Sequence, residues 1–127
     1  MATDYVFRLE GKIKPYVRMT QRSKGVEAQA MEYMANKQAL QYQFKAQMME
    51  HNWGMLPEKT ALYLELEYSV AERLHGFDLD NVLKAVSDAM QAIVIGNDLW
   101  IDRVRAERRL GDRFSAVVKV GVVKVVR

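Results

Sequence analysis

Hydrophobic and polar residues alternate in two segments of the chain. Residues 5–10 alternate until a glycine follows, and residues 60–70 alternate more cleanly, with leucine, tyrosine or valine at the even positions from 62 onward. A period of two predicts strands with one buried face. Further on, the basic segment 101–110 and the valine-rich segment 114–126 flank a Gly-Asp-Arg turn, which predicts two more strands joined as an antiparallel hairpin.

Two other segments repeat hydrophobic residues every three or four positions, the spacing of one helical face. In residues 26–50 the repeat comprises Ala30, Tyr33, Leu40, Phe44 and Met48, with Lys37 as the exception. In the segment after residue 78 it comprises Leu79, Val82, Leu83, Val86, Met90 and Ile93. The resulting order, β-α-β-α-β-β, predicts an α/β (α+β) fold in one domain, residues 1–127. We expect a mixed sheet whose helices pack mainly on one face.

Composition limits the kinds of function that are open to this chain. Its 127 residues include no cysteine and two histidines, so disulfides, zinc–thiolate sites and thiol nucleophiles are excluded and histidine-based sites are poorly supplied. No apolar run approaches membrane-spanning length, and the N-terminus lacks the apolar region of a signal peptide. We therefore expect a cytoplasmic protein with no membrane partner. A net charge of +3 is compatible with a polyanionic partner without requiring one.

Three aspartates flank the second predicted helix. Asp78 and Asp80 lie directly in front of it, and Asp98 follows it in an Asn-Asp turn. If the helix folds back so that its two ends share one crevice, the three carboxylates converge with Lys84 beside them. Clustered carboxylates repel one another unless a cation lies among them, and a hard divalent ion with oxygen ligands is the usual partner. Each residue also has an ordinary structural explanation, as a helix cap, a surface ion pair or a turn residue.

A basic segment precedes the first predicted helix. Residues 12–24 contain no acidic residue, and their cations are Lys12, Lys14, Arg18, Arg22 and Lys24. Such a loop suits contacts with the phosphates of a nucleic acid, and a solvated basic loop is the alternative explanation. Arg73, in the loop before the aspartates, is a further candidate for a phosphate contact.

The run DLDNVLKAVSDAMQ followed by GNDLWID resembles the signature of the RusA-type crossover-junction endodeoxyribonucleases, small dimeric Holliday-junction resolvases common in prophages. Asp78, Asp80, Asn81, Lys84 and Asp98 match the positions of that signature, and the resemblance is strongest over residues 76–103. The departures are Asn97 in place of a first aspartate in the turn, and Leu99 and Trp100 after it.

The resemblance implies a homodimeric enzyme that resolves four-way DNA junctions by paired symmetrical nicks in DNA recombination and repair. It implies Mg²⁺, with Mn²⁺ as a substitute, held by Asp78, Asp80 and Asp98, and Lys84 as a catalytic residue that stabilises developing charge. Asn81 is expected beside the ligands rather than among them, and Asp102 is a further candidate ligand. In the family a basic loop at residues 12–24 contributes to DNA binding.

Other functions remain open at this point. A non-catalytic nucleic-acid-binding module would keep the basic segments and need none of the aspartates. A metal-dependent nuclease for other branched or duplex DNA would share the aspartates without preferring four-way junctions. A structural phage protein would use the aspartates only as caps, each worth about 1 kcal/mol.

Overall fold

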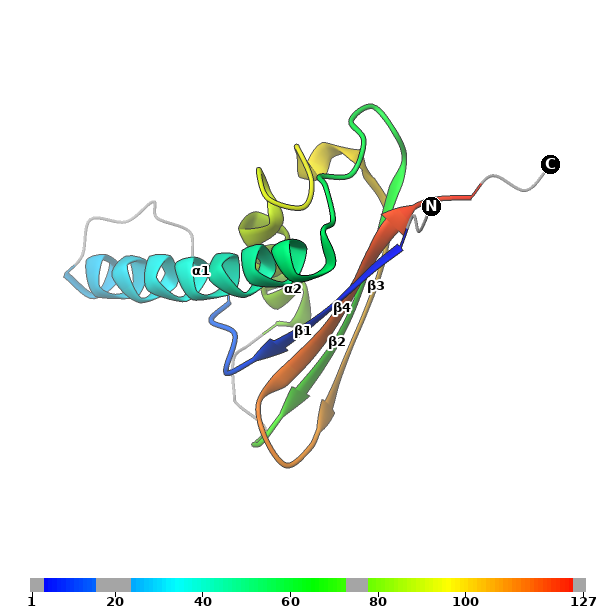
Figure 1. Ribbon diagram of the computed structural model, residues 1–127. Coiled ribbons are helices and arrows are strands. Elements are labelled where there is room, and N and C mark those ends of the chain that lie inside the picture. Colours follow the sequence, from blue (N-terminus) through cyan, green and yellow to red (C-terminus); the bar gives the residue numbers. More distant parts are fainter. Residues whose placement is uncertain (1–3, 16–23, 73–77, 125–127) are drawn as a thin grey trace.

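The computed structural model describes residues 4–15, 24–72 and 78–124, which form a sheet with two helices on one of its faces (Figure 1). The strands are β1 (Asp4–Glu10), β2 (Leu62–Val70), β3 (Ile101–Leu110) and β4 (Ser115–Val122), and the helices are α1 (Lys24–His51) and α2 (Leu79–Met90). Their order along the chain is the predicted β-α-β-α-β-β. The predicted fold class, a mixed α+β fold, is therefore confirmed.

The order of strands within the sheet corrects one prediction. The strands lie in the order β1-β4-β2-β3, so β3 and β4 do not form the expected hairpin. β4 instead lies between β1 and β2, antiparallel to both, and β3 pairs in parallel with β2. The reason is the difference in hydrophobicity between the last two strands. The valine-rich strand takes a central place, whereas the arginine-rich strand takes an edge, where charged side chains reach water.

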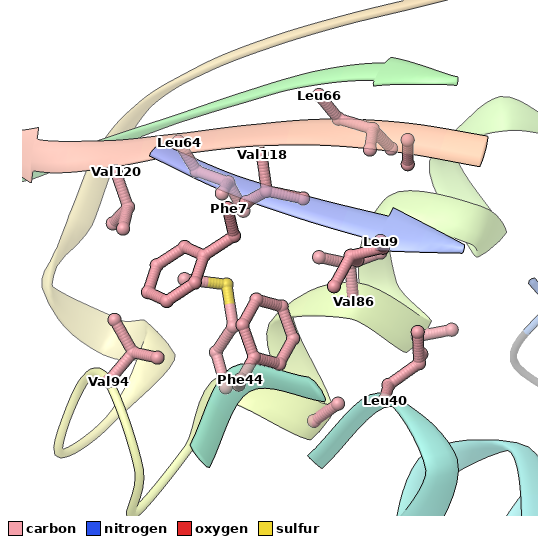
Figure 2. Close-up of a cluster of buried hydrophobic side chains, with 14 of the residues drawn as sticks. Phe7, Leu9, Leu40, Phe44, Leu64, Leu66, Val86, Val94, Val118 and Val120 are labelled. Carbon is pink, nitrogen blue, oxygen red and sulfur yellow. The ribbon is translucent and has the colours of Figure 1, made fainter. Parts of the chain in front are cut away.

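The core lies between the sheet and the two helices (Figure 2). Alternate residues of the strands point into it, among them Phe7, Leu64 and Val118, each at most 1 % exposed. The predicted repeat on α1 supplies Leu40 and Phe44, and the ring of Phe44 meets that of Phe7 edge to face at 4.9 Å. These contacts fix both helices on one face and leave the opposite face of the sheet open.

Three amide side chains of α1 bond to the chain along the outer edge of β1 and just beyond it. Gln47 exchanges two hydrogen bonds with the backbone of Arg8, and Gln43 does the same with Glu10. Asn36 accepts a hydrogen bond from the backbone N–H of Lys14 and donates one to the carbonyl of Lys12. Since these groups would otherwise be open to another strand, α1 closes this edge of the sheet.

At the opposite edge, the outer side of β3 has no strand beside it in the part of the chain that the structure describes. β3 is also the most exposed strand, since eight of its ten residues are exposed, two are half-buried and none is buried. The two edges of the sheet are therefore unlike.

Candidate functional site

Asp78 and Asp80 lie at the start of α2 and are exposed to solvent. Asp78 holds the N-cap position in an extended conformation, but its side chain makes no capping hydrogen bond; its backbone carbonyl accepts the first bonds of the helix, from Asn81 and Val82. Asp80 accepts a hydrogen bond from the backbone N–H of Asn81 at 3.1 Å, which occupies one carboxylate oxygen. Helix capping therefore does not explain why both aspartates stand here, and most of their carboxylate oxygens face water.

The orientation of α2 explains why these acids face outward. The helix buries a face that includes Val82, Val86 and Met90, and its exposed side chains lie on the opposite side. Asp80 and Lys84, four residues apart, are both exposed and so lie on one outward surface of the helix. Asp88 differs from them: it is half-buried and accepts a hydrogen bond from the Tyr33 hydroxyl at 2.8 Å, a contact that joins the two helices.

Asp98 lies in a short 3-10 turn, Asp98–Trp100, that leads into β3. Asn97 caps this turn, since its side-chain oxygen accepts a hydrogen bond from the backbone N–H of Leu99 at 2.9 Å. The turn therefore needs Asn97, whereas the exposed carboxylate of Asp98 remains available. Val94 and Ile95 are fully buried just before the turn and fix its place against the core.

The structure does not bring the three predicted ligands together within one chain. Asp78 and Asp80 lie at the N-terminal end of α2, and Asp98 lies beyond its C-terminal end. The twelve residues of α2 span about 18 Å, so the length of the helix separates the two positions. Accordingly, the described residues contain no group of three acidic or histidine side chains that could hold a metal ion. The expectation that both helix ends share one crevice is corrected for the single chain.

Asp102, the further candidate ligand, is exposed at the start of β3, on the Asp98 side of the fold. The register of β2 and β3 shifts here, because Leu62 pairs with Ile101 and Tyr63 with Arg103. Asp102 is thus the extra residue of a bulge, and bulges often re-aim a side chain.

The described part of the basic segment lies at the same end of the sheet as Asp78 and Asp80. The backbone N–H of Ile13 donates to the hydroxyl of Tyr68, near the end of β2 from which the chain leads to α2. Beside it, the ammonium of Lys12 lies 5.8 Å from the ring centre of Phe114, and Lys14 forms a long ion pair with Glu32 at 3.7 Å. Arg18, Arg22 and Arg73 lie outside the described residues, as does the side chain of Lys24.

The family model described as endodeoxyribonuclease RusA matches residues 10–121, nearly the whole chain. This chain belongs to the RusA family. The family consists of endodeoxyribonucleases, and membership implies Holliday-junction resolution in DNA recombination. RusA nucleases generally depend on a divalent metal. No curated protein matches the chain. None of the helices in the described ranges is both long and apolar enough to cross a bilayer.

Sequence analysis missed the amides that close the edge of β1. Asn36, Gln43 and Gln47 are spaced by seven and four residues, which places them on one side of α1. This spacing was a usable signal. A polar stripe beside the buried stripe of a long helix indicates amides that face backbone rather than water.

Proposed function

We propose that this chain is a Mg²⁺-dependent endonuclease that resolves four-way DNA junctions by paired symmetrical nicks, acting as a cytoplasmic homodimer in DNA recombination and repair. The observation that carries the proposal is the exposed pair Asp78 and Asp80 at the start of α2, in a chain of the RusA family. A protein that only binds DNA gains nothing from two outward carboxylates, because they repel phosphate.

The residues at the start of α2 suit a magnesium ion. Mg²⁺ prefers oxygen ligands and is often held by one or two carboxylates together with water and substrate phosphate oxygens. Asp78 and Asp80 offer these oxygens two residues apart, and Asn81 is next to them on the helix. When bound, the ion would neutralise charge on the scissile phosphate and lower the pKa of a water molecule.

The protein's own groups would position the DNA around these carboxylates. The ammonium of Lys84, one helical turn after Asp80, would hold a non-bridging phosphate oxygen and stabilise the charge that develops there. Lys12, Lys14, Arg18, Arg22, Lys24 and Arg73 would bind the flanking phosphates, which fixes the register of the strand without reading its sequence.

Asp98 enters the proposal through the homodimer. Asp98 and the pair at the start of α2 lie at opposite ends of the helix, so one chain cannot use all three on one phosphate. A second chain in the opposite orientation would bring its Asp98 to the start of α2 of the first. Each of the two sites would then combine Asp78 and Asp80 of one chain with Asp98 of the other, and the two-fold relation would favour symmetrical nicks.

A comparison of substrates tests the proposal. Wild-type protein with Mg²⁺ is given a mobile four-way junction, a flapped duplex and a linear duplex of the same sequence, and the nicked products are mapped. We expect paired nicks at equivalent positions of opposite strands in the junction alone. Equal cleavage of flap or duplex would favour a nuclease of different substrate geometry, and binding without cleavage would leave a binding module.

A further inference from the structure

Leu99 is an exposed apolar side chain in the turn that carries Asp98. It is 72 % exposed, more than any other large apolar side chain of the described residues outside α1. Single exposed leucines are common on protein surfaces, so exposure alone assigns no role. The position of Leu99 is what matters, because it directly follows Asp98, which the proposed function places in the active site. The chain therefore presents an apolar group where its DNA substrate would lie.

Hydrogen bonds within the turn fix the backbone of Leu99. Its N–H donates to the side-chain oxygen of Asn97 at 2.9 Å, and the N–H of Trp100 donates to the carbonyl of Asn97 at 3.3 Å. The N–H of Ile101 closes the turn by donating to the carbonyl of Asp98. Trp100 itself is half-buried and packs against the core. Leu99 is thus held in place before a ligand binds, which lowers the entropic cost of a contact.

The segment in front of the turn is anchored in the core. Val94 and Ile95 are fully buried, and the carbonyl of Val94 accepts a hydrogen bond at 2.9 Å from the N–H of Leu56, in the loop after α1. The carbonyl of Ile95 accepts a second one at 2.7 Å from the N–H of Ala92. A displacement of the turn would disturb these contacts, so Leu99 stands on a rigid support.

The turn directs three consecutive side chains to different sides. A 3-10 helix has three residues per turn, so successive side chains point about 120° apart. Trp100 takes the direction toward the core, which leaves Asp98 and Leu99 on the two solvent-facing sides. Their Cα atoms are about 3.8 Å apart. A DNA strand whose phosphate reaches Asp98 therefore brings an adjoining nucleotide within reach of Leu99.

We propose that Leu99 packs against the face of a base at the branch point of a four-way junction and separates that base from its neighbour. This inference deepens the proposed function, on which it rests, because it names a residue that selects the branched substrate. Leucine is among the apolar side chains that proteins insert between base steps. It forms no hydrogen bond, so it gains nothing from phosphate oxygens, and the large apolar surface of a nucleotide is the face of its base.

The branch point is where such a contact costs least. In a continuous duplex every base is stacked on both sides, and an inserted side chain must first unstack a base step. At a branch point the strands change partners and stacking is interrupted, so unstacking costs less there, as it does for mismatched or unpaired bases. Leu99 therefore strengthens binding to a junction and leaves binding to a linear duplex unchanged.

Binding and base stacking test this role in EDTA, where metal-dependent cleavage is prevented. A four-way junction carries 2-aminopurine, whose fluorescence rises when it unstacks, at each position beside the branch point in turn, and a linear duplex carries the same label. We expect wild-type protein to raise the fluorescence in the junction. Leu99→Ala should lose most of this rise and bind the junction about tenfold more weakly, because it removes most of the apolar contact, and should bind the duplex as wild type does.

Two further variants separate the chemistry of the side chain from its mere presence on the surface. Leu99→Met keeps a large apolar side chain and should restore both the fluorescence rise and the junction affinity. Met49→Ala shortens an apolar side chain that is 82 % exposed on α1 and should behave as wild type in every assay. Sedimentation and urea denaturation of Leu99→Ala should also match wild type, because the side chain is exposed and precedes β3.

Three results overturn the proposal: an unchanged fluorescence rise and junction affinity in Leu99→Ala, an equal loss of affinity for junction and duplex, or a weaker dimer, which would place Leu99 against the partner chain. The outcome is distinguishable from that of the proposed function. If wild type unstacks bases through Leu99 but cuts no DNA with Mg²⁺, only the proposed function fails. If wild type makes paired nicks and Leu99→Ala unstacks the label equally well, only this inference fails.

Discussion

The side-chain amide of Gln47 makes two hydrogen bonds, each of 2.9 Å, with the backbone N–H and carbonyl of Arg8. The N–H of Arg8 donates to the side-chain oxygen of Gln47, whose amide nitrogen donates to the carbonyl of Arg8. A side chain of a helix thus takes the place of a neighbouring strand. This relationship holds α1 along β1 and leaves β3 as the edge where the sheet can grow.

Replacing Gln47 should weaken the fold measurably. Gln47→Ala removes both bonds to Arg8, and we expect a loss of about 1 kcal/mol in the free energy of unfolding, because each such bond contributes about 0.5–1.5 kcal/mol and these are solvent-exposed. Urea denaturation measures it. Gln38→Ala is the matched control, since Gln38 is exposed on the same helix. Equal losses in both variants would contradict the role given to Gln47.

The core beneath the sheet makes a second prediction. Phe44 is fully buried and packs against Phe7, so Phe44→Ala should lower the free energy of unfolding by about 3–5 kcal/mol. Tyr42→Ala removes an aromatic ring from the same helix at a position that is 74 % exposed and should cost far less. Thermal or urea unfolding compares the two. Similar costs would mean that α1 does not pack as Figure 2 shows.

Two aspartates of α2 should respond differently to the same change. Asp80→Asn should reduce cleavage about a hundredfold or more and leave stability nearly unchanged, because Asp80 is exposed and serves the metal. Asp88→Asn should keep cleavage and lower stability by about 1 kcal/mol, because Asp88 holds Tyr33. Junction cleavage and urea denaturation of both variants separate these roles. If Asp88→Asn lost cleavage but kept its stability, Asp88 would belong to the active site, and the roles given to the two aspartates would be wrong.

Mixing two inactive chains tests whether the site is shared. Asp80→Asn and Asp98→Asn should each be inactive, but in their heterodimer one site combines an intact Asp78–Asp80 pair with an intact Asp98. The mixture should therefore regain nicking at one strand of the junction. If each chain held a complete site, both sites of the heterodimer would be damaged, and the mixture would remain as inactive as its parts.

The sequence was a good guide to local structure and a poor one to how the parts meet. The repeats of Leu62 to Val70 and of Tyr33 to Met48 predicted a strand and a helix, since buried faces leave a periodic trace. The place of β4 between β1 and β2 has no such trace, because strand order depends on packing between distant segments. Its valines, set against the arginines of β3, were the one available indication.

The same holds for the candidate site. The run from Asp78 to Lys84 is local, so its position at a helix start followed from spacing. The relation between Asp80 and Asp98 is not local: it depends on the length of α2 and on how the segment after it packs against the core. Sequence alone suggested one crevice, whereas the fold separates the residues by a whole helix.

The most direct test of the account is cleavage of a mobile four-way junction by wild type and by Asp80→Asn, each with Mg²⁺ and with EDTA, while binding is followed in parallel. We predict paired nicks by the wild type with Mg²⁺ only, and no nicks by the variant although it binds the junction as tightly. Two results would contradict the account. One is wild-type protein that binds the junction but does not cleave it with any divalent metal, Mn²⁺ included. The other is an Asp80→Asn variant that cleaves normally.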